Sequence, residues 1–531
     1  MPPPPQNNLS RLGFAVFVII ALALAAYYRF PGLGERPMHT DEAILAMKFA
    51  EFQSSGHFQY DPKDFHGPGL HYLTRCWASL AGWGNVTTWT EEGLRTVPVI
   101  CSLLLLLCTL LLHDALGRLG TAFAMLLAAI SPMMVYYSRY FIMEVPLVLF
   151  VTLCIAALWR WSQDRKIGWL VLAGLALGMQ HATKETFAIN VVAGLVGWGV
   201  ASMITGGFAP HVTSFALGSS RRRISRPWLW VAAIAALASI TLYSGFFRDW
   251  QAVQDSATTY FHYLNRSEGV GHEKPWHYYL TLLVWRKDGQ VWTEAMIVGF
   301  AIIGMAHAFL GNHIKQPSRQ AFLVFLSVYA VVLLAIYSFL AYKTPWSILS
   351  AQHALILLAG VGAAATSQSI RGKIPRLVYR IAFGYGLYNL IAQTNLAIHL
   401  YAADSRNPYV YSHTTTNLLR LLPVVRDLQK IAPDDAFDVL VVNRDAGWPL
   451  PWYWRDIKSA RYATTLPETI DARVIIAEAD MKTDLEAKLG GKNYFMQGPF
   501  GLRPGVMLNL WVEQSLWDRH NLRKQQEATS Q

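Results

Sequence analysis

Four short groups of charged and polar residues are spread along this chain, and each follows an apolar stretch. They lie at residues 39–42, 139–144, 184–185 and 342–346. A charged side chain at the boundary of a membrane costs free energy unless it is paired or used. Each group follows an odd-numbered apolar stretch, so all four are expected on the same side of a membrane. The pattern therefore predicts one functional site at that boundary.

The adjacent acids Asp41 and Glu42 are candidates for proton transfer. Neighbouring residues on a helix point about 100° apart, so one acid can face a reacting group while the other holds a helper group. His39, two residues earlier, is a supporting candidate. An aspartate beside a hydroxyl group can take its proton as a general base. The alternative is structural, with Thr40 capping a helix and both acids complementing its dipole.

Three basic residues near the ends of apolar stretches are candidates for binding a phosphate group. Arg139 can do so through paired hydrogen bonds, and Lys184 and Lys343 can do so as point charges. Supporting groups beside them are Glu144, Glu185 and Tyr342. The alternative is structural ion pairing, of Arg139 with Glu144 and of Lys184 with Glu185. Taken with the paired acids, the three bases suit a reaction in which a phosphate or pyrophosphate leaves.

A His-Gly-Pro-Gly turn at residues 66–69 lies in the same loop as the acids. Its glycines let the backbone approach a ligand closely, and His66 offers protonation or hydrogen bonding. A plain turn before a surface helix is the alternative. A divalent metal held by Asp41, Glu42 and His66 is a further option.

The composition is that of a membrane protein. The 531 residues are 53% hydrophobic and 15% charged, and the mean hydropathy is +0.26, whereas a soluble globular protein carries about 25% charged residues. Crossing a bilayer takes roughly 17–25 apolar residues, and the apolar stretches predict about eleven spans. Their expected positions are residues 12–30, 94–113, 120–137, 143–160, 168–184, 186–204, 228–247, 291–310, 321–341, 346–365 and 377–399.

Basic residues in the short loops predict the orientation. Loops after even-numbered spans are rich in Lys and Arg, and such loops stay in the cytoplasm. The odd-numbered loops, including the long ones at residues 31–93 and 248–290, then face outward. The predicted site therefore lies on the extracytoplasmic face of a multi-pass protein of the cell (plasma) membrane. The basic residues concerned are Arg160, Arg165, Lys166, Arg221, Arg222, Arg223, Arg226, Lys315, Arg319, Arg371, Lys373 and Arg376.

The predicted fold is an all-α polytopic membrane protein with interfacial helices and a small C-terminal α/β domain. Residues 1–11 are a Pro-rich cytoplasmic leader, 12–400 the membrane domain and 401–531 the extracytoplasmic domain. Periodicity predicts surface helices at 42–52 and 70–80, buried strands at 437–442 and 472–477, and a polar helix at 480–489.

Several function classes are disfavoured by what the sequence lacks. It contains no GxGxxG, P-loop, GxSxG or HExxH motif, which argues against ATP-driven transport and common soluble hydrolase chemistry. The net charge of +11 follows largely from the basic cytoplasmic loops. It comes with no nucleic-acid-binding motif, so no nucleic-acid partner is expected.

Taken in order, the motifs resemble a known family. The Asp41-Glu42 pair, the His-Gly-Pro-Gly-Leu turn at 66–70 and an Arg-containing loop after the third span resemble the dolichyl-phosphate-mannose–protein mannosyltransferase group. These are polytopic glycosyltransferases of the GT-C fold. The Lys184-Glu185 pair and the segment at residues 342–346 are similar to a prokaryotic subfamily labelled flippase-activity-associated proteins. The resemblance covers residues 12–400.

The resemblance implies a mannosyltransferase-like enzyme that takes a sugar from a polyprenyl-phosphate donor and inverts the anomeric centre by direct displacement. Asp41 would be the catalytic acid/base with Glu42 as its partner, and Arg139 would bind the donor phosphate. Lys184 and Lys343 are added to that role from their positions. Members generally work without a metal. The MIR-type soluble domain of eukaryotic members has no counterpart here, so the acceptor stays open between protein, glycan and lipid.

Two other functions stay open beside the transferase. A flippase or transport-associated protein for lipid-linked sugars would also carry charge in the membrane. Transporters bind near the midplane, between repeats, whereas these charges gather at one boundary. The third option is a non-catalytic assembly protein that keeps the fold, against which the Asp41-Glu42 pair argues.

Overall fold

The computed structural model describes residues 9–63, 66–205, 226–266, 272–311, 316–432 and 437–529. The chain divides into two compact units. Unit 1 consists of residues 1–33, 52–80 and 95–409, and unit 2 of residues 34–51, 81–94 and 410–531. Most of the leader expected at residues 1–11, and the basic residues Arg221, Arg222, Arg223 and Lys315, lie outside the described residues.

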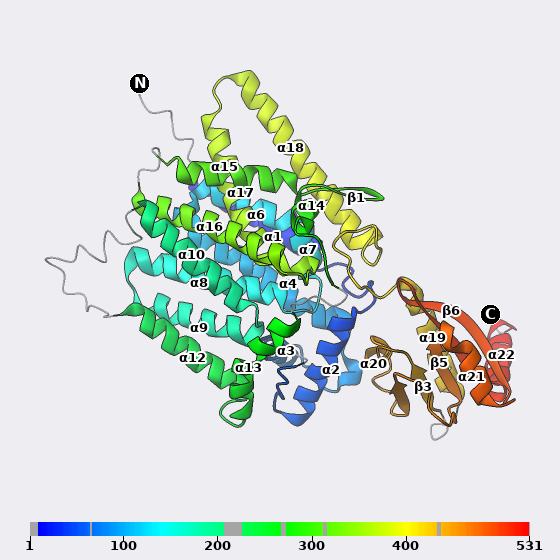
Figure 1. Ribbon diagram of the computed structural model, residues 1–531. Helices are drawn as coiled ribbons and strands as arrows, with labels where there is room; N and C mark the ends of the chain where they lie inside the picture. Colours follow the sequence, from blue (N-terminus) through cyan, green and yellow to red (C-terminus); the bar gives the residue numbers. More distant parts are fainter. Residues whose placement is uncertain are drawn as a thin grey trace. The chain divides into compact units, whose positions relative to one another are not determined.

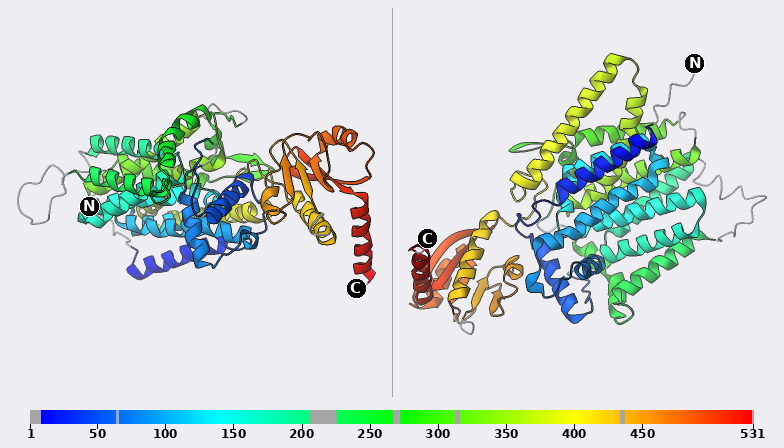
Figure 2. Two further views of the ribbon diagram at one scale, coloured as in Figure 1. Left: turned by 90° about the horizontal axis from the view of Figure 1, so that it is seen from below. Right: turned by 180° about the vertical axis from the view of Figure 1, so that it is seen from behind.

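Unit 1 is a bundle of helices that lie side by side (Figure 1). Its helices are α1 (Arg11–Arg29), α3 (Gly69–Leu80), most of α4 (Glu91–Thr109), α5 (His113–Leu116), α6 (Arg118–Ile130), α7 (Pro132–Ser138), α8 (Glu144–Asp164), α9 (Ile167–Thr183), α10 (Phe187–Thr205), α12 (Pro227–Tyr243), α13 (Gln251–Arg266), α14 (Tyr278–Val284), α15 (Ala295–Phe309), α16 (Pro317–Phe339), α17 (Leu349–Ser369) and α18 (Lys373–Asn395). A hairpin of β1 (Arg286–Asp288) and β2 (Gln290–Trp292) precedes α15. The views in Figure 2 show the same bundle from below and from behind.

The apolar helices occupy the positions expected for the spans. In the described residues, six helical segments are long and apolar enough to cross a membrane, or up to seven if the bent pair α6 and α7 is one span. Three shorter apolar helices, α9, α12 and α15, coincide with further expected spans, and α18 coincides with the last one. The chain is therefore a multi-pass membrane protein, as predicted.

Glycines bring α17 into close contact with its neighbours. A Cβ atom on Gly360 would lie 2.3 Å from the carbonyl oxygen of Gly120 in α6, and one on Gly362 would lie 1.9 Å from the carbonyl oxygen of Phe300 in α15. Between helices in lipid, small residues let backbones approach and gain van der Waals contact. Accordingly, 94% of the apolar stretch that contains α17 is buried inside the bundle.

The break between α6 and α7 is caused by Pro132. Proline has no N–H to donate to the carbonyl oxygen four residues earlier, here that of Ala128, and the two helices meet at a bend of 59°. Buried Arg29 of α1 replaces the missing donors, because its guanidinium donates to the carbonyl oxygens of Ala128 and Ala129, each at 2.9 Å. Arg29 thus keeps these carbonyl groups hydrogen-bonded at the break, just before the loop that carries Arg139.

Unit 2 is built on a five-stranded sheet in the order β4-β3-β5-β7-β6. Its elements are most of α2 (Thr40–Ser55), α19 (Leu421–Ile431), β3 (Val439–Val442), α20 (Leu450–Tyr453), β4 (Ala460–Ala463), β5 (Val474–Glu478), α21 (Lys482–Leu489), β6 (Tyr494–Arg503), β7 (Val506–Glu513) and α22 (Gln514–Thr529). Strands β4, β3 and β5 are parallel, and β7 is antiparallel to β5 and β6.

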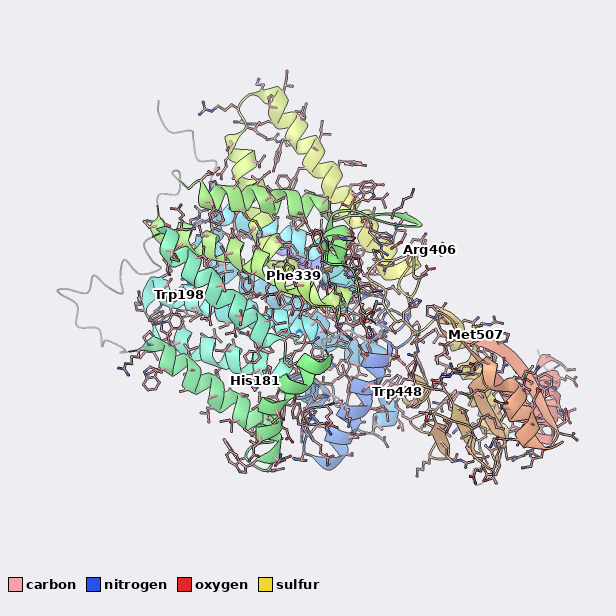
Figure 3. All side chains as sticks on the ribbon, viewed as in Figure 1. His181, Trp198, Phe339, Arg406, Trp448 and Met507 are labelled. Carbon is pink, nitrogen blue, oxygen red and sulfur yellow. The ribbon has the colours of Figure 1, made fainter. Side chains whose placement is uncertain are left out.

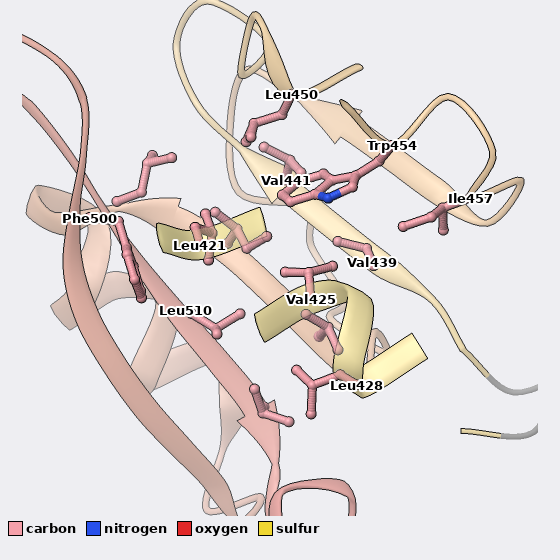
Figure 4. Packing of buried hydrophobic residues seen from close by; sticks show 14 of the residues in the cluster. Leu421, Val425, Leu428, Val439, Val441, Leu450, Trp454, Ile457, Phe500 and Leu510 are labelled. Atoms are coloured by element: carbon pink, nitrogen blue, oxygen red, sulfur yellow. The ribbon is translucent and has the colours of Figure 1, made fainter. Parts of the chain in front are cut away.

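Alternate residues of β3 enter two different cores, as the two-residue period of a strand requires. Val439 and Val441 join the core that also contains Leu421 of α19 (Figure 4), and Leu440 and Val442 join the core on the other face. The expected strands at 437–442 and 472–477 are β3 and β5, and the polar helix expected at 480–489 is α21. The predicted small α/β domain is confirmed.

Two pieces of the expected first external loop belong to unit 2. Trp452 Nε1 donates to the Glu91 carboxylate at 2.8 Å, and Arg455 donates to the carbonyl oxygen of Trp89 at 2.6 Å. Conversely, residues 401–409, expected at the start of the C-terminal domain, belong to unit 1. These contacts join residues far apart in the chain, which explains why local patterns placed the boundary elsewhere.

Candidate active site

The paired acids stand in the first turn of α2, and the structure gives them different environments. His39 caps the helix, because its Nδ1 accepts the backbone N–H of Asp41 at 3.1 Å. Glu42 accepts the backbone N–H of His39 at 2.9 Å and pairs with Arg36 at 2.8 Å. This reciprocal arrangement is a capping box with histidine in place of Ser or Thr. Glu42 is fully buried, whereas the Asp41 side chain is 49% exposed.

Asp41 is therefore the acid of this pair that a substrate can reach. His39 Nε2 donates to the carbonyl oxygen of Tyr411 at 3.0 Å, which assigns the proton to Nε2 and leaves Nδ1 as the acceptor. The nearest oxygen of Asp41 lies 3.8 Å from that Nδ1. Glu42 thus makes contacts at the helix start, where the capping residue is His39 rather than Thr40. The catalytic roles of Asp41 and Glu42 stay predictions.

In unit 1, Glu144 and Lys184 form a buried ion pair that lines a cleft. The Nζ of Lys184 donates to the Glu144 carboxylate, and neither side chain is more than 10% exposed. Thr186, Tyr337 and Trp346 also line this cleft. Members of three of the four predicted groups, those at 139–144, 184–185 and 342–346, thus meet around one space.

A second, largely apolar cavity adjoins the cleft, and Val148 and Ser350 line both. The apolar residues of this cavity are Leu112, Val148, Val151, Ile155, Leu326, Ala354 and Leu357. His353 also lines it, and among the described residues neither nitrogen of its buried ring has a hydrogen-bond partner. The cleft is thus lined by charged and hydroxyl groups, and the adjoining cavity is lined mainly by apolar side chains.

The connection between α9 and α10 presents successive side chains to opposite sides. Lys184 has an extended backbone, in which neighbouring side chains alternate. Lys184 and Thr186 line the cleft, while Glu185 contacts His66, with 2.6 Å between Oε2 and Nδ1. The ion pairs expected between sequence neighbours are thus replaced by pairs between distant residues.

Glycines hold the turn at residues 66–69 against the end of α9. A Cβ on Gly67 would lie 2.3 Å from the carbonyl oxygen of Ala182, and one on Gly69 would lie 2.6 Å from the hydroxyl of Thr183. Only glycine permits so close an approach. The turn therefore seats His66 beside Glu185, two residues beyond Thr183.

The Glu185 carboxylate is ionised at neutral pH. Burial raises its pKa, but the charge and hydrogen bond of His66 and the charge of Lys184 outweigh burial and hold the pKa at about 2. A charged carboxylate on Nδ1 fixes both the orientation of the imidazole and the nitrogen that stays accessible.

Arg139 is buried and binds the end of α1. Its Nη1 donates to the carbonyl oxygens of Tyr28, Arg29 and Pro31 at 3.2, 3.0 and 2.7 Å, and its Nη2 donates to that of Gly32 at 3.1 Å. Cations stabilise the unpaired carbonyl groups at a helix C-terminus. The structure thus gives Arg139 a helix-capping contact that the sequence did not predict, and its contact with phosphate stays a prediction.

Lys343 is buried beside the end of α16, where its Nζ donates to the carbonyl oxygen of Leu340. Burial lowers the pKa of this ammonium group. Its backbone N–H donates to the carbonyl oxygen of His272 at 3.1 Å, and Tyr342 forms an antiparallel bridge with Glu273. No carboxylate in the described ranges forms an ion pair with Lys343, so its charge is available to an anion.

Sequence reasoning missed several residues that line the charged cleft and its apolar extension. They are Thr186, Tyr337, Ser350 and His353. A signal existed for His353, because an ionisable residue inside an apolar span indicates function by default. Thr186, Tyr337 and Ser350 carried no such signal.

The part of the chain that the structure describes contains no preformed cluster for a divalent metal. No group of three or more His, Cys, Asp and Glu side chains there is placed to hold an ion. Of the three residues considered, Glu42 already binds Arg36 and His66 already binds Glu185. Metal dependence stays a prediction.

Comparison with known proteins agrees with this architecture. Residues 20–249, which begin within α1 and extend past the end of α12, match the family model described as dolichyl-phosphate-mannose-protein mannosyltransferase. A search of curated proteins found no match. The fold is similar to that of ArnT from Cupriavidus metallidurans bound to undecaprenyl phosphate, with a TM-score of 0.59 and 14% identity over 94% of this chain and 98% of that one.

A second similar structure is the archaeal oligosaccharyltransferase AglB from Archaeoglobus fulgidus, in complex with an inhibitory peptide and a dolichol-phosphate. Its TM-score is 0.55, with 11% identity over 95% of this chain and 74% of that one. Similarity at such low identity establishes the fold. Together with the family match, it confirms the GT-C resemblance that the motifs predicted.

Proposed function

We propose that this chain is a membrane glycosyltransferase of the GT-C group, and that it moves a sugar from a polyprenyl-phosphate donor to an acceptor hydroxyl on the extracytoplasmic face. Asp41 takes the proton of the acceptor hydroxyl as general base. The acceptor oxygen bonds to the anomeric carbon while the bond from that carbon to the phosphate oxygen breaks. The electron pair leaves with polyprenyl phosphate. One direct displacement of this kind inverts the anomeric centre.

The observation that carries this proposal is the two-part space in unit 1. A polyprenyl-phosphate sugar has a charged head and a long apolar tail. The cleft offers the Lys184–Glu144 ion pair and hydroxyl groups, and it adjoins a mostly apolar cavity at Val148 and Ser350. An amphipathic lipid donor fits a site with this order of chemistry. The family match at residues 20–249 supports mannose as the first sugar to test.

The environments of the two acids support Asp41 rather than Glu42 as the base. Glu42 is buried and bound to Arg36 and to the N–H of His39, so freeing it would break the start of α2. Asp41 keeps its carboxylate half exposed. We assign phosphate recognition first to Lys343, because Lys184 would have to leave the Glu144 carboxylate to bind a phosphate. A phosphate contact by Arg139 would likewise compete with the four carbonyl groups it now binds.

Transfer of radiolabelled mannose from polyprenyl phosphate, by the purified full-length protein in lipid vesicles, tests the proposal. Asp41→Asn is compared with the wild type and with Glu51→Gln, a variant of an exposed acid on the same helix. We expect label in a glycan, lipid or protein fraction for the wild type and Glu51→Gln, and a loss of roughly 10²–10⁴-fold for Asp41→Asn. The product should have the inverted anomeric configuration.

Other outcomes of this assay contradict separate parts of the proposal. Equal transfer by Asp41→Asn and the wild type removes Asp41 as the base but keeps the enzyme. A retained anomeric configuration removes direct displacement. If no donor is consumed, while lipid-linked sugar crosses the vesicle membrane only when the protein is present, the chain is a flippase and the transferase proposal fails.

A further inference from the structure

The His66–Glu185 pair lies on the other side of the α9–α10 connection from the donor cleft. Lys184 and Thr186 line that cleft, and Glu185, between them, contacts His66 instead. The donor chemistry proposed above uses neither residue. The position of the pair is nevertheless well defined, because Gly67 and Gly69 allow the turn to pack closely against the end of α9, which places His66 next to Glu185.

His66 keeps one nitrogen for a ligand. Its Nδ1 is bound to Glu185, and its side chain is 36% exposed, whereas that of Glu185 is 11% exposed. No described residue forms a hydrogen bond with Nε2. An imidazole whose Nδ1 is held by a carboxylate presents Nε2 in a fixed direction, which suits it to recognise a hydroxyl group.

The phenol groups of Tyr60 and Tyr260 lie close enough to the Glu185 carboxylate for its charge to affect their pKa values. Burial, and to a smaller extent the negative charge of Glu185, raise the pKa of Tyr60, to about 12, and that of Tyr260. Both phenols are therefore neutral and can donate as well as accept a hydrogen bond. The Tyr260 hydroxyl is buried and has no partner among the described residues. Its ring stacks on that of His181. His181 lies near the end of α9 and is labelled in Figure 3.

Exposed aromatic rings follow at the end of α12. Tyr243, the last residue of that helix, packs edge-on against Tyr60 with ring centroids 4.9 Å apart. Phe246 and Phe247 come next, 60% and 50% exposed, with φ angles of 63° and 68°. Bulky side chains rarely adopt a left-handed backbone, and such strain gathers at functional sites. Phe246 also contacts the ring of Tyr72.

We propose that His66, Tyr60 and Tyr260, with Glu185 as the positioning residue, form an acceptor subsite for a carbohydrate. A sugar carries hydroxyl groups that both donate and accept, and C–H faces that pack on aromatic rings. The cluster offers an imidazole nitrogen, neutral phenols and aromatic rings, which is the matching chemistry. This inference rests on the proposed transferase function and selects glycan from the three acceptor classes left open by the sequence.

The same observations disfavour the other two acceptor classes. An anionic lipid acceptor would need a cation in the subsite, but the neighbouring Lys184 points to the opposite side and pairs with Glu144. A recurring mode of binding an extended peptide is strand addition at a sheet edge, whereas the described elements around His66 are helices and a turn.

Binding of short oligosaccharides to the full-length protein in lipid nanodiscs, followed by saturation-transfer NMR, tests the subsite. The probes are mannotriose, maltotriose and triacetylchitotriose, with a Ser/Thr-containing octapeptide as the competing class. Two variants separate ligand binding from support. His66→Asn keeps a polar atom near Nδ1 for Glu185 but loses the reach of Nε2, and His66→Gln keeps a polar atom near Nε2.

We expect at least one trisaccharide to bind the wild type, about fivefold weaker binding by His66→Asn, and a smaller loss by His66→Gln, since one hydrogen bond to a ligand is worth roughly 1 kcal/mol. The matched control is His57→Asn, which alters another histidine of the same loop that pairs with an acid, Asp249. It should bind like the wild type. A merely supporting role for His66 predicts the reverse order, with His66→Asn tolerated.

Three results would overturn the inference: no trisaccharide binding by the wild type, equal binding by His66→Asn, or octapeptide binding that depends on His66. Transfer of radiolabelled mannose from polyprenyl phosphate tests the transferase function separately. Donor consumption without trisaccharide binding removes only the subsite. Trisaccharide binding that depends on His66, without donor consumption, keeps a carbohydrate site and removes the transferase.

Discussion

Replacing Gly67 with Ala should displace His66 without altering any functional group. The added Cβ would lie 2.3 Å from the carbonyl oxygen of Ala182, and contacts shorter than 3.0 Å are essentially never seen for a Cβ, so the turn must retreat by at least about 0.7 Å. A retreat of that size would lengthen the 2.6 Å contact between His66 and Glu185 to more than about 3 Å.

The expected cost has a structural and a functional part. Overpacking of this kind costs about 1–3 kcal/mol of unfolding free energy, which we expect as a fall of several degrees in the melting temperature of the protein in nanodiscs. The displacement removes the hydrogen bond that His66→Asn also removes, so trisaccharide binding should weaken by a similar factor, about fivefold. Melting followed by fluorescence, and saturation-transfer NMR, measure the two parts.

Gly84→Ala is the matched control for this prediction. Gly84 belongs to the same expected loop, and its added Cβ would meet no atom within 4 Å. That variant should melt and bind like the wild type. If Gly67→Ala were as stable as Gly84→Ala and bound trisaccharide as well, the turn could not be what seats His66, and the reasoning from glycine contacts to the subsite would be refuted.

Three further predictions concern stability, each measured by unfolding of the purified protein. Glu42→Ala should cost about 2–3 kcal/mol, because it removes the carboxylate that accepts from Arg36 and from the backbone N–H of His39, while Asp41→Ala should cost under about 0.5 kcal/mol; equal costs would contradict the assigned roles. The pKa of Glu185, lowered from 4.5 to about 2, contributes about 3 kcal/mol that is present above pH 4.5 and lost as the pH falls towards 2, so the stability gap between the wild type and Glu185→Gln should narrow over that window. Arg29→Met should cost at least about 2 kcal/mol, because two buried carbonyl groups lose their donors; a neutral effect would show that other groups satisfy them.

The positions of the spans could be read from the sequence because lipid imposes a strong local rule. Every backbone polar group in the bilayer must pair within its own segment, so an apolar stretch of sufficient length becomes a helix. The helices α8 and α16 accordingly coincide with the stretches expected at 143–160 and 321–341. The strands β3 and β5 were predictable for a related reason, since buried parallel strands are short, continuous apolar runs.

Partners of the charged residues could not be read in the same way. Sequence neighbours suggested pairs of Arg139 with Glu144 and of Lys184 with Glu185. In the structure Lys184 binds Glu144, and Glu185 binds His66, over separations of 40 and 119 residues. The alternation of side chains along the α9–α10 connection sends adjacent residues to opposite sides, and that geometry follows from where α9 ends.

What the sequence alone determined is the membrane architecture, the small α/β domain and the groups of residues able to do chemistry, because hydropathy, period and residue type act locally. Tertiary structure decided which of those residues are free to act. The side chain of Asp41 is half exposed, whereas Glu42 is buried and bound to Arg36 at the start of α2. Arg139 binds the end of α1. Such choices depend on which backbone groups, far away in the chain, need a partner at the same place. No local pattern records that need.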